Sequence, residues 1–137
     1  MSFRGRLVFS FALLTSAGCS SAGPTNNNGN NNPNPPGLPG GTPVLTASVT
    51  VDDNFYSPNS VLLAVGGEVT WNWVGSNGHS VTSSGSSTFS PNAPVRTTPA
   101  TLRVTFPTTG DYRYFCTVHG QSNYYSSGDM VGVIFVR

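Results

Sequence analysis

The chain after residue 46 alternates apolar and polar side chains with a period of two, which is the pattern of half-buried β-strands. The clearest segments of this kind are residues 47–51, 60–65, 69–73, 102–106 and 131–136. Turn-forming residues separate them, notably Gly66-Gly67 and the segment from Pro107 to Gly110. No segment of helical length shows a 3.6-residue period. The sequence therefore predicts an all-β domain, a Greek-key β-sandwich of about seven to eight short strands.

The N-terminus has the parts of a secretory signal peptide, which we assign to residues 1–18. Arg4 and Arg6 precede a short apolar run, and small residues follow it. The apolar run is too short to span a bilayer. Cys19 then stands where a bacterial lipoprotein signal places its acceptor, so we expect lipid chains there to anchor the protein to a membrane surface. The alternative is ordinary cleavage nearby, which would leave a soluble protein.

Composition divides the rest of the chain into two parts. Residues 19–44 are rich in Asn, Pro and Gly and have almost no large apolar side chain, which predicts a disordered tether. Residues 45–137, about 93 residues, are enough for one domain with a single core.

Without Arg4 and Arg6 the formal charge falls by two, from +1 to −1, and the chain contains no lysine. The absence of a basic stripe argues against a nucleic-acid partner.

Four side chains suited to a soft metal ion occur in the predicted domain. Once the signal segment is set aside, Cys116 and Met130 are the only Cys and Met apart from Cys19, and His79 and His119 are the only histidines. Thiolate and thioether sulfur favour Cu(I) and imidazole suits Cu(II), so this set tolerates both copper oxidation states. Zinc is the competing metal, but no carboxylate is placed in the sequence as a general base, and copper outcompetes zinc at such ligands.

The motifs around these residues resemble those of the cupredoxins, in particular the plastocyanin-like group. The similar segments are GEVTW at residues 67–71, GHSV at 78–81, GDYRYFCTVH at 110–119 and GDMVG at 128–132. The resemblance implies one copper ion with His79, Cys116 and His119 as strong trigonal ligands and Met130 as a long axial ligand. It also implies that Ser80 hydrogen-bonds to the loop that carries Cys116.

The chain departs from this family between His119 and Met130, where plastocyanins have a short link. Ten residues intervene here, including Tyr124 and Tyr125. The longer link leaves Gln121 as a rival to Met130, because Gln can also take the axial position. We expect Met130 to be the ligand, since it leads directly into the predicted last strand.

The sequence predicts an electron-transfer protein with a mononuclear type 1 (blue) copper site, which passes one electron between redox partners outside the cytoplasm. The alternative is an extracytoplasmic copper-binding or delivery protein without an electron-transfer role. An enzyme is not expected, because copper oxidases and nitrite reductases need more than two histidines. We expect a monomer in the periplasm or on the outer cell surface that docks redox proteins weakly near His119 and touches the membrane only through its lipid anchor.

Overall fold

The computed structural model describes residues 36–122 and 129–137, and their regular secondary structure consists of strands alone. The strands are β1 (Val44–Asp52), β2 (Phe55–Ser57), β3 (Ser60–Trp73), β4 (His79–Ser84), β5 (Ala93–Arg96), β6 (Ala100–Thr105), β7 (Gly110–Phe115) and β8 (Val131–Val136). The all-β prediction is confirmed. These residues contain no helical segment that could cross a membrane.

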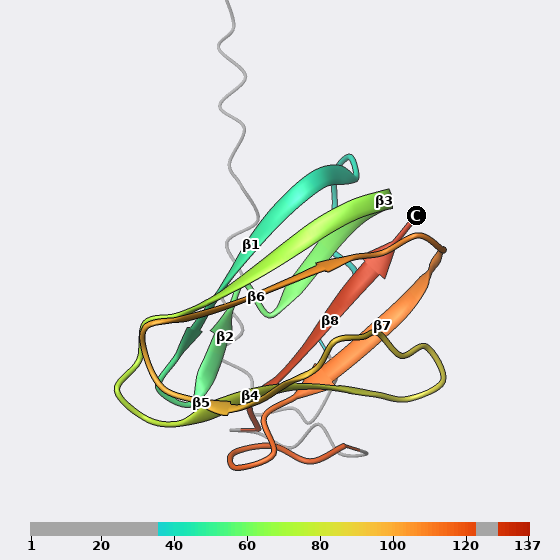
Figure 1. The fold of residues 1–137 in the computed structure, drawn as a ribbon. Coiled ribbons are helices and arrows are strands. Elements are labelled where there is room, and N and C mark those ends of the chain that lie inside the picture. Colours follow the sequence, from blue (N-terminus) through green and yellow to red (C-terminus); the bar gives the residue numbers. More distant parts are fainter. Residues whose placement is uncertain (1–35, 123–128) are drawn as a thin grey trace, which may run out of the picture.

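The strands form two layers that share β3 (Figure 1). In one layer the second half of β3 pairs in parallel with β1 and antiparallel with β6, and β2 extends β1 as a hairpin. In the other layer the first half of β3 pairs in parallel with β8, which continues antiparallel through β7 and β4 to β5. Inward-facing side chains of the two layers pack against each other and form the core.

The change of layer takes place at Gly66-Gly67, where the sequence predicted a turn. The structure has a corner inside one long strand instead, and the chain changes direction there (Figure 1). Gly66 has φ +80°, a region that glycine enters without strain. A Cβ on Gly67 would lie 2.8 Å from Leu63 Cγ and 2.9 Å from the Leu45 carbonyl oxygen. Both glycines are therefore needed for the tight corner.

The core contains aromatic residues from the inward-facing positions of β3 and β7. Trp71, Trp73, Tyr112 and Tyr114 are all buried. The rings of Trp71 and Tyr114 meet edge to face with centroids 5.4 Å apart, a favourable arrangement for aromatic pairs. Cys116 continues the inward series of β7 and is fully buried. The core thus fixes the direction in which the cysteine sulfur points.

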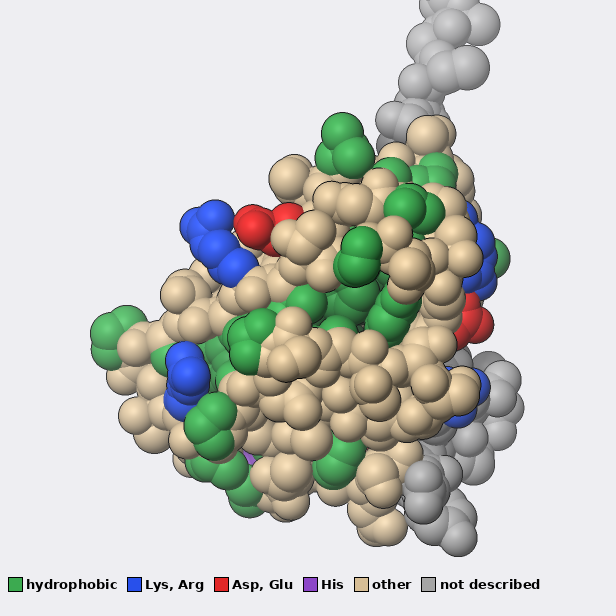
Figure 2. Space-filling model, turned by 45° about the vertical axis from the view of Figure 1, so that its right-hand side comes forward, with side chains coloured by type: hydrophobic (Ala, Val, Ile, Leu, Met, Phe, Trp, Pro, Cys, Tyr) green, Lys and Arg blue, Asp and Glu red, His purple; other side chains and the backbone are tan. Residues whose placement is uncertain are grey.

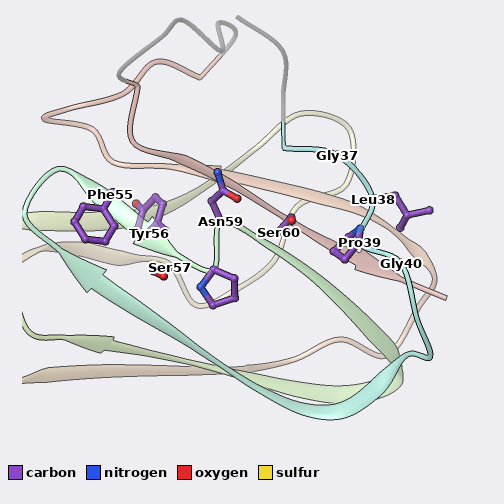
Figure 3. Close-up of a pocket in the computed structure, with 10 residues that line it drawn as sticks. Gly37, Leu38, Pro39, Gly40, Phe55, Tyr56, Ser57, Asn59 and Ser60 are labelled. Atoms are coloured by element: carbon purple, nitrogen blue, oxygen red, sulfur yellow. The ribbon is translucent and has the colours of Figure 1, made fainter. Parts of the chain in front are cut away.

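Several predictions concern residues outside the described ranges. These are the signal peptide of residues 1–18, Cys19, the tether as far as residue 35, and Tyr124 and Tyr125. Residues 37–40, at the end of the predicted tether, line a groove together with β2 and the turn after it (Figure 3). The groove is lined by no His, Cys or Met, so it is separate from the predicted metal ligands.

Candidate metal centre

The structure brings His79, Cys116 and His119 together at one end of the sandwich. His79 is the first residue of β4, and Cys116 follows the last residue of β7 directly. Because β4 and β7 are antiparallel neighbours, the start of one strand lies beside the end of the other. His119 lies three residues beyond the cysteine, in the loop at the same end.

The three potential ligand atoms form a small triangle. Cys116 Sγ lies 3.8 Å from His79 Nδ1 and 3.7 Å from His119 Nδ1, and the two Nδ1 atoms are 3.1 Å apart. The point equidistant from the corners of such a triangle lies about 2.1 Å from each, which matches the ~2.0–2.3 Å bonds of imidazole and thiolate to a metal ion. One ion can therefore contact all three atoms.

The three potential ligands, His79, Cys116 and His119, differ in their exposure to solvent. His79 and Cys116 are 0 % exposed, whereas His119 is partly exposed. A buried thiol with no disulfide partner among the described residues is a soft ligand shielded from solvent. His119 is thus the ligand candidate with an edge at the protein surface.

Ser80 links the two segments that carry the site, and this prediction is confirmed. Its hydroxyl oxygen accepts a hydrogen bond of 2.9 Å from the Thr117 N–H and lies 3.1 Å from the Thr117 hydroxyl. The Ser80 N–H also points at Cys116 Sγ, 3.4 Å away. A donor at this position stabilises negative charge on the sulfur. Ser80 therefore holds the cysteine loop in place and directs a backbone N–H at the sulfur.

Met130 lies beside the triangle, and Gln121 does not replace it. The Met130 N–H donates to the His119 carbonyl, and the Met130 carbonyl accepts from the Cys116 N–H, both at 2.9 Å. The Met130 side chain is 1 % exposed and belongs to the core, whereas Gln121 is exposed. The backbone bonds and burial favour Met130 over Gln121 as the fourth ligand.

The side chains of Trp73 and Tyr56 hold the backbone around His79, and neither residue was among the predicted site residues. Trp73 Nε1 donates to the His79 carbonyl at 2.9 Å. The Tyr56 hydroxyl donates to the Ser80 carbonyl at 2.5 Å. Burial is the main reason why the pKa of Tyr56 lies well above its usual value, so this hydroxyl keeps its proton and remains a donor.

Asp53 is a functional candidate that was not among the site residues predicted from the sequence. Its Oδ1 atom lies 3.5 Å from His79 Nε2 and accepts a hydrogen bond of 2.7 Å from the Asn77 N–H. That N–H is the largest cause of a lowered Asp53 pKa, with smaller contributions from the Ser76 N–H and His79. No local motif signals this contact, since the end of β1 reaches the loop before His79 through the parallel pairing of β1 with β3 and the hydrogen bonds from Val74 and Gly75 to Val51.

Fold and site together define a β-sandwich with a soft-metal triangle at one end, and comparisons with solved structures identify the architecture as the cupredoxin fold. A purple cupredoxin from Nitrosopumilus maritimus is 24% identical over 66% of this chain and 99% of its own, with a TM-score of 0.53. An oxidised amicyanin variant is 22% identical, covering 67% of this chain and 82% of its own at a TM-score of 0.54. A reduced Cu(I) amicyanin variant is 23% identical with the same coverage and a TM-score of 0.52.

No protein-family model matches the chain, and no curated protein does. The structural likeness therefore establishes the cupredoxin-like fold. The resemblance predicted from the motifs is confirmed at the level of the fold.

Proposed function

We propose that this domain binds one copper ion through His79, Cys116 and His119, with Met130 as a weaker axial ligand, and transfers single electrons. The observation that carries the proposal is the triangle of two Nδ1 atoms and one Sγ atom, whose dimensions suit a single ion. When bound, copper would supply the one-electron Cu(II)/Cu(I) chemistry. The similar structures include oxidised and Cu(I) forms of amicyanin, which supports this assignment.

The surroundings of the ligands support rapid electron transfer. His79 and Cys116 are fixed by backbone hydrogen bonds, and the core packs behind them. A rigid set of ligands that suits both oxidation states keeps the reorganisation small when an electron arrives or leaves. The protein's contribution is therefore to hold the ligand atoms in nearly the same positions in both states.

The site is better suited to a carrier than to an enzyme. Three strong ligands and a buried thioether leave little room for a substrate to coordinate. The carboxylate of Asp53 lies 3.5 Å from His79 and faces Nε2, on the side of the ring away from Cys116. It is not placed to act as a general base on a molecule bound at the triangle.

The surface around His119 suits brief contacts with another redox protein. A shallow hollow beside this histidine is lined by the uncharged residues Asn54, Asn77, Gly78, Val95 and Val118. Val95 and Val118 are about half exposed, at 51% and 56%. Figure 2 shows apolar side chains gathered at the end of the molecule where a histidine edge reaches the surface. A small uncharged patch of this kind favours weak, transient docking of the monomer.

Export and lipid anchoring are part of the same proposal and are supported by the sequence. The signal segment of residues 1–18 and the position of Cys19 indicate a protein on the outer side of the cytoplasmic membrane. A tether between the lipid and the domain would let the His119 surface reach partners near the membrane.

Copper loading of the purified protein tests the function. We expect an intense thiolate-to-copper absorption band, a paramagnetic resonance signal of a copper–thiolate site, and fast reversible one-electron voltammetry. The Cys116→Ser variant is the control and should lose the band. A colourless site, or one that cycles slowly, would favour copper delivery. Failure to take up copper would refute the proposal.

A further inference from the structure

The ring nitrogen of His79 that faces away from the metal triangle has two partners of opposite kind. Nε2 lies 3.5 Å from Asp53 Oδ1, an acceptor, and 3.4 Å from the Asn54 N–H, a donor. His79 is 0 % exposed, so water cannot readily serve this nitrogen. A neutral imidazole carries its proton on one nitrogen only. The two contacts therefore correspond to the two tautomers of His79.

Only one of these tautomers can bind a metal ion at the triangle. Nδ1 faces Cys116 Sγ and His119 Nδ1, so its lone pair must be free for ligation and the proton must lie on Nε2. The proton on Nε2 requires an acceptor, and Asp53 supplies it among the described contacts of this nitrogen. In the other tautomer Nε2 has no proton and accepts a hydrogen bond from the Asn54 N–H, and the proton lies on Nδ1, where the metal would bind.

We propose that Asp53 is a positioning residue that selects the metal-binding tautomer of His79 and tunes the reduction potential of the site. This inference rests on the proposed copper function. The 3.5 Å separation between Nε2 and Oδ1 is longer than a short hydrogen bond, so the carboxylate acts mainly through its negative charge. A negative charge beside the ligand ring makes Nδ1 a stronger donor and favours the more highly charged oxidised metal.

The carboxylate of Asp53 is held in place by contacts other than His79. Its Oδ1 accepts the Asn77 N–H at 2.7 Å, and Gly75 packs against the turn so closely that a Cβ there would lie 2.7 Å from the Asp53 nitrogen. Asn54 adopts φ +71°, which turns the chain from β1 into β2. The carboxylate is thus fixed by the turn and does not depend on His79 for its position.

Two variants separate charge from contact. Asp53→Asn keeps an oxygen that can accept the Asn77 N–H but removes the charge, and Asp53→Ala removes both. The control is Asp111→Asn, which makes the same charge change at the start of β7, at the end of the strand remote from Cys116. The asparagine variant preserves the turn's hydrogen bond, so it is expected to fold, which urea unfolding checks.

The first readout needs no copper. Nitrogen NMR of the metal-free full chain labelled on histidine reports the tautomers directly, and the two histidines of the chain simplify assignment. We expect the fraction of His79 with its proton on Nε2 to fall in the order wild type, Asp53→Asn, Asp53→Ala. An unchanged fraction in both variants would overturn the proposal.

The second readout uses Cu(II) itself as the probe. We expect the affinity for Cu(II) to fall by about tenfold in Asp53→Ala and less in Asp53→Asn, as for other partners of metal-bound histidines. The reduction potential should rise in the same order and stay unchanged in Asp111→Asn. If Asp53→Asn and Asp111→Asn change the potential equally, the effect of Asp53 is one of net charge alone, and the proposed positioning role is refuted. Failure of the copper function would instead appear in the wild type, as absence of the thiolate band.

Discussion

Gly120 follows His119 and lies against the backbone that joins the ligand loop to Met130. A Cβ at this position would lie 2.6 Å from the Met130 carbonyl oxygen and 3.2 Å from the Cys116 carbonyl oxygen. Both neighbours are backbone atoms, so rotation of a side chain cannot relieve the contact. We predict that Gly120→Ala destabilises the domain and distorts the metal centre together.

The size of the effect follows from the distances. A carbon and a carbonyl oxygen prefer about 3.3–3.6 Å, so the Met130 carbonyl must retreat by about 0.7 Å or more. It accepts the Cys116 N–H at 2.9 Å, and that hydrogen bond would lengthen beyond its normal range. Overpacking costs about 1–3 kcal/mol and a lost hydrogen bond about 1 kcal/mol. Alanine also restricts the unfolded chain more than glycine does, which stabilises the folded state by about 0.4–1 kcal/mol. The net loss in the free energy of unfolding is therefore about 2 kcal/mol.

Urea unfolding of the metal-free protein measures this loss. A change of about 2 kcal/mol should lower the midpoint by roughly 1 M. Gly40→Ala is the matched control, because nothing lies within 4 Å of a Cβ there, and its stability should change by less than about 0.5 kcal/mol. Copper binding by Gly120→Ala should also weaken. If the two variants unfold at the same midpoint, the steric argument is wrong.

Three further predictions concern other parts of the molecule. Met130→Ala should change the absorption spectrum and the reduction potential of the copper-loaded protein, whereas Gln121→Ala should leave both unchanged, because Gln121 is exposed; the reverse result would transfer the axial role to Gln121. Tyr56→Phe should lower the free energy of unfolding by about 1–3 kcal/mol in denaturant titrations, because it leaves the buried Ser80 carbonyl without its donor, and an unaltered value would contradict this. Cys19→Ala should move the protein from the membrane to the soluble fraction and remove any lipid mass from the mature N-terminus. If the substitution changes neither the cell fraction that holds the protein nor the mass of its N-terminus, lipidation is excluded.

Much of the fold could be predicted because strong strands carry their signal locally. The alternation in residues 47–51 and 69–73 and the inward series of Tyr112, Tyr114 and Cys116 follow from the two-residue repeat of a strand with one buried face. The short strands β2 and β5 were missed because three or four residues carry too little periodicity. The strand β4 was missed because Ser and Thr dominate it, so it becomes a strand through pairing with β5 and β7.

The candidate site, too, was predicted in part from the sequence and in part known only from the structure. The identity of the ligands could be read from the chain because Cys, His and Met are scarce in it, and their chemistry suits one metal. The structure added the 3.1–3.8 Å triangle and the burial that separates Met130 from Gln121.

The amino-acid sequence by itself determined an all-β domain and the set of side chains available for a metal ion, because periodicity and residue chemistry are local properties. Only the tertiary structure decided that the Asp53 carboxylate lies beside Nε2 of His79 and that the Tyr56 hydroxyl donates to the Ser80 carbonyl. Both contacts join residues 24 to 26 positions apart, and they arise from the pairing of β1 with β2 and β3, for which no short motif exists.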